Sequence, residues 1–230
     1  MKQYSHIIFD LDHTLWDFTA NSNATLKILH DRHSLQDFEI VLEEFMEHYQ
    51  VVNDQMWYDY NRGNITKEDI RSKRFKITFS RVGLVNDKLA DLINEEYLEM
   101  CPAMGHLIPR ALEVLEYLKE KYRLHILTNG FSEIQGIKMQ TSGLLPYFQE
   151  VVNSDISGFL KPDKRIFDFT LGKIQAACHD CVMIGDDLHA DVIGARNAGI
   201  DHIYFNRKKA LHNELVTHEI GCLSELLKIL

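Results

Sequence analysis

Two aspartates separated by a single residue follow a short apolar run near the start of this chain. Ile7-Ile8-Phe9 has the apolar character of a buried strand, and Asp10-Leu11-Asp12 comes directly after it. Two carboxylates crowded at a strand end repel each other and lose hydration, unless a cation, a proton or a phosphate ligand compensates. Aspartate is also common in ordinary turns, so the pair alone leaves a purely structural explanation open. The pair suggests, as a hypothesis, a magnesium-dependent site for phosphoryl transfer.

The composition is that of a globular chain with a substantial core. The 230 residues are 45% hydrophobic and 26% charged, which excludes a disordered chain. No apolar run approaches the roughly 20 residues that span a bilayer, and the first residues lack a signal-peptide pattern. We therefore expect a cytoplasmic protein without a membrane partner, either a monomer or a small homo-oligomer. The net charge of −9 opposes binding of polymeric nucleic acid but permits a small anion at a locally positive site.

Short apolar runs alternate with longer segments of helical period over most of the chain. This alternation predicts an α/β fold, a doubly wound parallel sheet with helices on both faces. The segments between the runs are long enough for right-handed crossover connections. The expected strands are Ile7 to Phe9, Leu124 to Thr128, Glu150 to Asn153, Val182 to Ile184 and Ile203 to Phe205.

Residues 16–96 do not follow this alternation. They are rich in Glu, Lys, Leu, Phe and Met at helical spacing, with few turn signals. We expect an all-helical domain at 16–96, inserted after the first strand of a core formed by 1–15 and 97–230. One apolar stripe of this insert is predicted at Phe38, Val41, Leu42, Phe45, Met46 and Tyr49.

Four polar groups fall at the ends of expected strands or in the loops just beyond them. They are Asp10 with Asp12, Thr128-Asn129-Gly130, Lys161-Pro162-Asp163, and Gly185-Asp186-Asp187 with Asp191 further on. The carboxyl ends of parallel strands meet at one edge of a sheet, so these groups are expected to converge. Each group alone is a weak signal. Together they provide a carboxylate nucleophile, a second acid, a hydroxyl, a lysine and ligands for a hard cation.

In order and spacing, the four groups resemble the four motifs of the haloacid dehalogenase superfamily. The resemblance covers essentially the whole chain, and the helical segment is similar to the family's C1 cap. It implies a Rossmann-like sheet. It also implies Mg²⁺ as the cofactor, bound by Asp10, the main-chain carbonyl of Asp12, and Asp186.

The mechanism suggested by the residues agrees with the one that the resemblance implies. Asp10 would attack a phosphate monoester to give an aspartyl-phosphate, while Asp12 donates a proton to the leaving oxygen and later accepts one from water. Crowding by like charge would raise the pKa of Asp12 in the direction this role needs. The phosphoryl group would be held by Thr128, Lys161, and the amides around Leu11 and Asn129. Asp187 and Asp191 are expected behind the site, orienting metal-bound water or Lys161.

The insert is expected to select the leaving group of a small phosphorylated metabolite. Asn53, Trp57 and Tyr60 combine an amide with aromatic rings, which could read and stack on a base. Packing of the helical insert explains the two rings equally well. This segment resembles the cap of bacterial pyrimidine 5′-nucleotidases, which implies a pyrimidine nucleoside 5′-monophosphate as substrate.

Several other activities stay open at this point. A phosphatase of another metabolite, such as a sugar phosphate, and a phosphosugar mutase would use the same aspartyl-phosphate chemistry. A dehalogenase would need neither a metal nor an acid at Asp12. A receiver-like signalling domain would be about half this length, with its aspartate on a later strand. The intact set of Asp10, Asp12, Thr128, Lys161 and Asp186 disfavours a non-catalytic phosphate-binding module.

Overall fold

The computed structural model describes residues 4–230, which form two compact units. One unit consists of the chain up to Phe18 together with Gly105–Leu230, and the other of Thr19–Met104. The domain limits expected from the sequence stay a prediction, and the last helix of the second unit continues beyond residue 96 to Met100.

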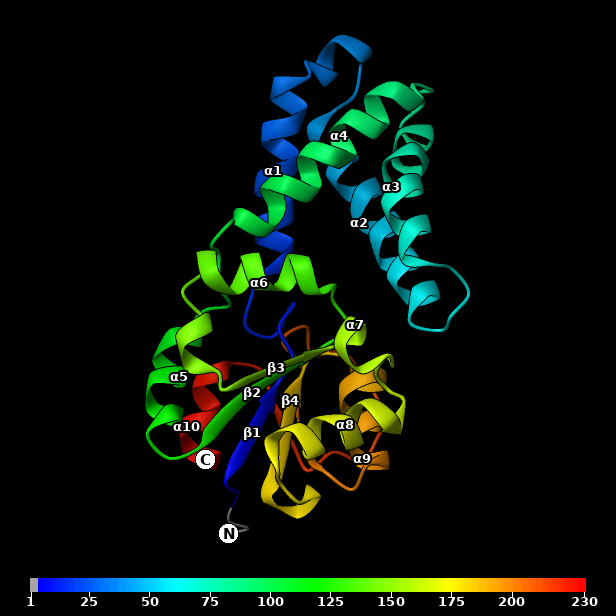
Figure 1. Cartoon of the computed structure of the whole chain (residues 1–230). Coiled ribbons are helices and arrows are strands. Elements are labelled where there is room, and N and C mark those ends of the chain that lie inside the picture. Colours follow the sequence, from blue (N-terminus) through cyan, green and yellow to red (C-terminus); the bar gives the residue numbers. More distant parts are fainter. Residues whose placement is uncertain (1–3) are drawn as a thin grey trace. The chain divides into compact units, whose positions relative to one another are not determined.

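The first unit is built on six parallel strands in the order β3-β2-β1-β4-β5-β6 (Figure 1). This is the strand order of the Rossmann fold, so the expected α/β fold is confirmed. The last strand was not predicted, because it is short and two of its three residues are exposed and polar. The strands are β1 (His6–Phe9), β2 (Arg123–Thr128), β3 (Glu150–Asn153), β4 (Cys181–Gly185), β5 (Asp201–Phe205) and β6 (His218–Ile220).

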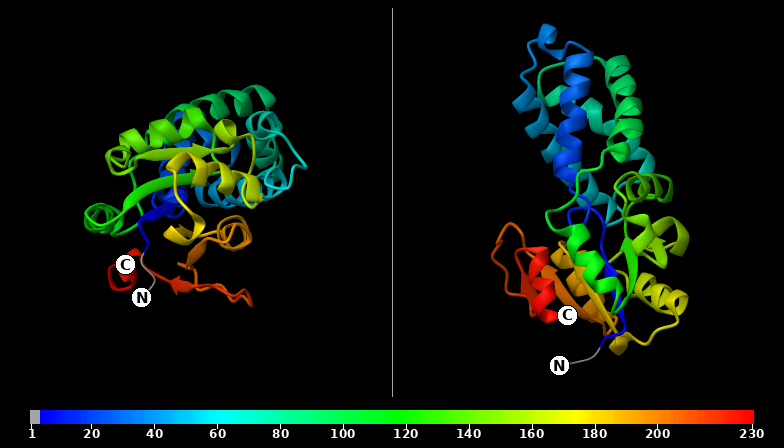
Figure 2. Two further views of the ribbon diagram at one scale, coloured as in Figure 1. Left: turned by 60° about the horizontal axis from the view of Figure 1, so that its bottom comes forward. Right: turned by 90° about the vertical axis from the view of Figure 1, so that its left-hand side faces the viewer.

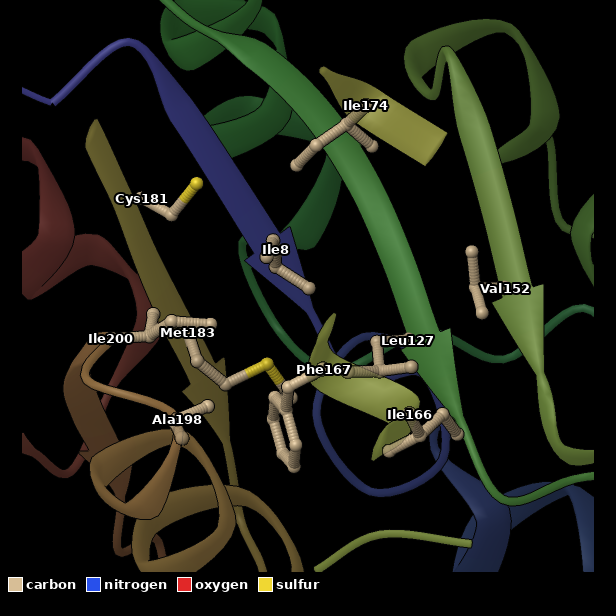
Figure 3. Packing of buried hydrophobic residues seen from close by; sticks show 11 residues of the cluster. Ile8, Leu127, Val152, Ile166, Phe167, Ile174, Cys181, Met183, Ala198 and Ile200 are labelled. Carbon is tan, nitrogen blue, oxygen red and sulfur yellow. The ribbon is translucent and has the colours of Figure 1, made fainter. Parts of the chain in front are cut away.

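Helices cover both faces of this sheet. Figure 1 shows α5 and α10 on one side and α8 and α9 on the other. Beneath α8 and α9, alternate strand residues such as Ile8, Leu127 and Met183 pack with Phe167 in a fully buried cluster (Figure 3). The helices of this unit are α5 (Ala111–Lys119), α6 (Ser132–Thr141), α7 (Ser154–Ser157), α8 (Lys164–Ile174), α9 (Gly194–Asn197) and α10 (Leu226–Ile229).

Strands β2 and β3 lie on one side of β1 in the sheet, and β4, β5 and β6 lie on the other. The direction in which the chain builds the sheet therefore reverses between the neighbouring strands β1 and β4. In doubly wound folds the crevice at such a point, beyond the carboxyl ends of the strands, is where ligands bind. Asp10 follows β1 and Asp186 follows β4. The topology therefore places two of the predicted functional carboxylates at this crevice.

The second unit is a bundle of four helices (Figure 2). Helix α3 packs against both α2 and α4. Rings from three helices meet in its interior, with Phe45 beside Phe79 and Tyr49 beside both Phe75 and Tyr97. The helices are α1 (Phe18–Arg32), α2 (Leu42–Tyr60), α3 (Lys67–Arg81) and α4 (Asp87–Met100).

The predicted apolar stripe of the insert is only partly correct. Phe45 and Tyr49 are fully buried, but Phe38 and Val41 are exposed. The helical period cannot extend back to them, because α2 begins at Leu42 and Glu39 has left-handed backbone geometry with φ of 60°. The chain turns between the two parts of the stripe.

Two buried histidines, on β1 and β2, make folding sensitive to acid. Nδ1 of His6 lies 3.0 Å from Nε2 of His125, and the rings are stacked. Burial, followed by the neighbouring His6, lowers the pKa of His125 to about 4 from 6.5, and burial also lowers the pKa of His6. The folded protein therefore resists protonation that the unfolded chain accepts, and stability is lost as the pH falls from 6.5 towards 4.

We expect His125→Gln to reduce this acid sensitivity. Denaturant unfolding at pH 7 and pH 5 should show a smaller drop in the free energy of unfolding for the variant than for the wild type. His179→Gln is the control, because His179 is exposed. Equal drops for wild type and H125Q would contradict the role of the histidine pair.

Candidate active site

The loop after β1 turns back tightly and presents Asp10 and Asp12. The amide of Asp10 donates to the carbonyl of Ile184 on β4 at 2.9 Å, which continues the sheet pairing by one residue. The amides of Leu15 and Trp16 both donate to the carbonyl of Leu11, which closes the turn. Thr14 then donates from Oγ1 to Oδ1 of Asp186 at 3.3 Å, linking this loop to the one after β4.

Lys161 joins three of the groups that the sequence placed at strand ends. Its buried Nζ donates to Oδ1 of Asp10 and Oδ1 of Asp191, each at 2.6 Å, and to the carbonyl of Leu127 at 2.9 Å. The Asn129 side chain holds its backbone, accepting from the Lys161 amide and donating to its carbonyl. Burial alone would lower the pKa of Lys161, but the two carboxylates raise it above its usual value. Lys161 is therefore a fixed positive charge.

Three buried or half-buried carboxylates lie close enough to share a cation. Oxygen atoms of Asp10, Asp186 and Asp191 all lie within 4.8 Å of one another. Burial raises the pKa of Asp10 to about 7, with Lys161 opposing this and Asp191 adding to it. The pKa of Asp186 is raised well above its usual range by burial and by the neighbouring aspartates. A hard cation with oxygen ligands, such as Mg²⁺, fits this donor set because it would relieve the repulsion.

Both carboxylate oxygens of Asp191 accept hydrogen bonds. Oδ1 accepts from Lys161, and Oδ2 accepts from the amide of Asp187 at 3.0 Å. A Cβ added at Gly185 would lie 2.1 Å from Oδ2 of Asp191, so this glycine leaves the space that Asp191 occupies. Asp191 therefore contacts Lys161 directly, and its role in orienting Lys161 or metal-bound water stays a prediction.

Asp187 holds the backbone that carries Asp191. Its Oδ1 accepts from the amides of His189 and Ala190, both at 2.8 Å, at the start of the π-helical turn Leu188–Ile193. Side-chain oxygens of this kind satisfy the free amides at the start of a helical segment. The predicted role of Asp187 behind the site, orienting metal-bound water or Lys161, stays a prediction.

The surroundings of Asp12 were not predicted. Lys138 on α6 donates from Nζ to Oδ1 of Asp12 at 2.6 Å, and Gln135 donates from Nε2 to Oδ2 at 2.8 Å. Burial raises the pKa of Asp12, but the charge and hydrogen bond of Lys138 and the Gln135 bond outweigh it, so the pKa is lowered. The expectation of a raised pKa was wrong, because it considered only the neighbouring aspartates.

One signal in the sequence could have indicated these two partners. Gln135 and Lys138 are three residues apart, so they share one face of the helix that follows Thr128-Asn129-Gly130. A polar pair is unusual on the buried face of a helix in an α/β protein.

Three further residues were predicted to hold the phosphoryl group through a side chain or an amide: Thr128, Leu11 and Asn129. Oγ1 of Thr128 accepts from the amide of Gly130 at 3.0 Å and from Nε2 of Gln135 at 2.8 Å. Leu11 is fully buried. The Asn129 side chain is bound to the backbone of Lys161, and the predicted contact of the Asn129 amide with phosphate stays a prediction.

The predicted specificity residues lie on α2 of the helical unit. Asn53 is 3% exposed, and its Oδ1 accepts from Nη1 of Arg74 at 3.1 Å. The Arg74 guanidinium lies 4.9 Å from the Tyr97 ring centre and 5.4 Å from that of Tyr49. Trp57 and Tyr60 are half-buried and meet edge to face, with ring centres 5.5 Å apart. The role of Asn53, Trp57 and Tyr60 in specificity stays a prediction.

Comparison with known proteins identifies the family. The model of the haloacid dehalogenase-like hydrolases matches residues 4–199. The chain belongs to this family. The hydrolase YfnB of Bacillus subtilis is 31% identical over 100% of this chain and 97% of its own length. Its crystal structure, bound to magnesium, has a TM-score of 0.89 at 28% identity and covers 99% of both chains.

Two further relatives of this chain are named pyrimidine 5′-nucleotidases. PynA of Streptococcus pneumoniae is 32% identical over 88% of this chain and 84% of its own. YjjG of Escherichia coli is 31% identical over 89% of this chain and 87% of its own length. Among the described residues, no helix is long and apolar enough to span a membrane.

Proposed function

We propose that this hydrolase is a Mg²⁺-dependent phosphatase that acts through a phosphorylated Asp10. The observation that carries the proposal is the state of the Asp10 carboxylate. Oδ1 is held by Lys161, while Oδ2 accepts no hydrogen bond from residues 4–230. A carboxylate with one oxygen fixed and the other open, beside a lysine and further carboxylates, suits in-line attack on phosphorus.

The proposed reaction has two steps. Asp10 attacks phosphorus, the bond from phosphorus to the leaving oxygen breaks, and a proton moves from Asp12 to that oxygen. Water then attacks the aspartyl-phosphate and gives its proton to Asp12, releasing inorganic phosphate and restoring Asp10. Thr128 and the amides near Leu11 and Asn129 hold the phosphoryl oxygens, and Lys161, whose three N–H groups bind Asp10, Asp191 and Leu127, places its positive charge beside them. When bound at Asp10, the main-chain carbonyl of Asp12, and Asp186, Mg²⁺ supplies charge neutralisation.

Asp12 has to gain its proton in the substrate complex. In the free protein its contacts with Lys138 and Gln135 lower its pKa and favour the carboxylate. A bound phosphate dianion places negative charge near this carboxylate, which favours the protonated form. The reaction therefore couples substrate binding to protonation of Asp12.

For the substrate, we propose a pyrimidine nucleoside 5′-monophosphate. Two relatives that match most of the chain, PynA and YjjG, are pyrimidine 5′-nucleotidases by name. We assign selection of the leaving nucleoside to the helical unit, where Trp57 and Tyr60 offer aromatic faces. Since Oδ1 of Asn53 is engaged by Arg74, the amide nitrogen of Asn53 is the group left for a base.

A sugar phosphate is the second candidate. Other relatives are named for such substrates, among them a glyceraldehyde 3-phosphate phosphatase of Pyrococcus abyssi, 29% identical over 97% of this chain. Purified protein with Mg²⁺ should be compared on pyrimidine monophosphates, purine monophosphates and small sugar phosphates. We expect the highest kcat/KM on a pyrimidine monophosphate. Equal or higher values on purine or sugar phosphates would reject this substrate, and isomerised sugar phosphate would indicate a mutase.

Mg²⁺ should stabilise the folded protein before any substrate is added. At a Mg²⁺ concentration about 100 times its Kd, linkage predicts about 2.7 kcal/mol, or about 5 °C in Tm or more for a chain of this size. Asp186→Asn should remove this shift, because it deletes a proposed ligand at the carboxylate cluster. Asp180→Asn, at an exposed position, is the control. A full shift in D186N would contradict the proposed ligand set.

A further inference from the structure

Helix α6 presents two side chains to Asp12, one to each carboxylate oxygen. Lys138 donates to Oδ1 at 2.6 Å, and Gln135 donates to Oδ2 at 2.8 Å. Both are at least nine-tenths buried, Lys138 at 6% exposure and Gln135 at 1%. Burying a lysine and an amide costs free energy, which their bonds to Asp12 offset.

Each of the two side chains is itself held in place. The Lys138 ammonium lies 4.5 Å from the Trp16 ring centre, a distance typical of a cation–π contact. The amide nitrogen of Gln135 also donates to Oγ1 of Thr128 at 2.8 Å. Gln135 therefore ties Asp12, from the loop after β1, to Thr128 at the end of β2.

The glycine of the Thr128-Asn129-Gly130 motif makes room for this link. A Cβ added at Gly130 would lie 2.0 Å from Nε2 and 2.5 Å from Cδ of Gln135. Real Cβ atoms essentially never approach so closely, so any larger residue must displace the Gln135 amide. This observation is independent of the hydrogen bonds and points to the same contact.

We propose that Gln135 and Lys138 are positioning residues, which hold the Asp12 carboxyl group in line with the leaving oxygen and in register with Thr128. The inference rests on the proposed phosphatase function and adds two residues to it. Proton transfer needs donor and acceptor within about 2.6–3.2 Å, so a carboxyl group that rotates freely transfers its proton less often. The Asp12 side chain is 25% exposed, so the burial of its own atoms does not fix it.

Leaving groups that differ in their need for a proton provide the test. An alkyl oxygen, as in a nucleoside 5′-monophosphate, needs the Asp12 proton when its bond to phosphorus breaks. The para-nitrophenolate ion leaves without one. We expect Gln135→Ala and Lys138→Met to lower kcat/KM, which reports the steps up to departure of the leaving group, about 100-fold on the nucleotide and less than about fivefold on para-nitrophenyl phosphate, in the direction of Asp12→Asn.

Gly130→Ala provides a second route to the same displacement. Gly130→Ala should lose as much activity on the nucleotide, relative to para-nitrophenyl phosphate, as Gln135→Ala does. The double variant should lose no more activity than either single variant, because both substitutions act through one contact. Gln140→Ala, exposed on the same helix, and Lys119→Met, exposed on α5, are the controls. Thermal melts establish that each variant is folded.

The outcomes separate this inference from the function on which it rests. Equal losses on both esters, or no loss on either, would overturn the positioning role and leave the phosphatase intact. A wild-type protein without Mg²⁺-dependent hydrolysis of either ester would overturn the proposed function and the inference together.

Discussion

Asp10→Asn is expected to fold normally and to lose phosphatase activity by roughly 10⁴-fold or more, because the amide cannot serve as the attacking oxygen. The substitution keeps the size of the side chain and still allows Lys161 to donate to its oxygen. It also removes one negative charge from a cluster in which burial and neighbouring aspartates raise the pKa of Asp10 to about 7. Without Mg²⁺ the variant should therefore be at least as stable as the wild type.

Steady-state rates, together with detection of phosphoenzyme after a rapid acid quench, would measure this result. The wild type should accumulate a protein-bound phosphate, and D10N should not. Asp31→Asn, an exposed aspartate of the helical unit, is the control and should retain full activity. Turnover by D10N close to the wild-type rate would reject Asp10 as the nucleophile.

Lys161→Met should reduce both activity and stability. The ammonium group is the shared partner of Asp10 and Asp191, and all three residues are buried. Removing one member of a buried ion pair typically costs about 3–5 kcal/mol, because the remaining charge has lost its partner. The loss in the free energy of unfolding should be smaller at pH 5 than at pH 8. The raised pKa values of Asp10 and Asp191 let these groups become neutral at the lower pH.

Denaturant unfolding at the two pH values measures this effect. Lys164→Met is the matched control. Lys164 lies three positions further on, at the start of α8, but it is exposed and pairs with Asp168 at the surface, so its loss should cost less than about 1 kcal/mol. A K161M protein as stable as K164M would contradict the view of Lys161 as a buried counter-charge.

Much of the catalytic unit follows from local patterns in the sequence. Four of the five expected strands, such as Leu124 to Thr128, form within one or two residues of their predicted limits, and the fifth, Glu150 to Asn153, matches them. Buried parallel strands are continuous apolar runs, which a sequence displays directly. The strand His218–Ile220 has no such run, since only Ile220 is buried.

The convergence of the polar groups also follows from the sequence, through topology. Once the strands are known to be parallel, Asp10 and Asp186 must lie at one edge of the sheet. The structure then shows their oxygens, with that of Asp191, within 4.8 Å of one another. Their roles as nucleophile and metal ligands remain proposals that the variants above would test.

What the sequence alone determined is the fold class and the edge at which the chemistry-bearing residues gather, because strand periodicity and parallel connections are local properties of the chain. Only the tertiary structure decided what each carboxylate contacts. Asp12 lies two residues from Asp10, yet its pKa falls because Lys138 and Gln135, over 120 positions away, bind its two oxygens. A pKa depends on all charges and hydrogen bonds within a few ångströms, and these neighbours are set by packing rather than by sequence order.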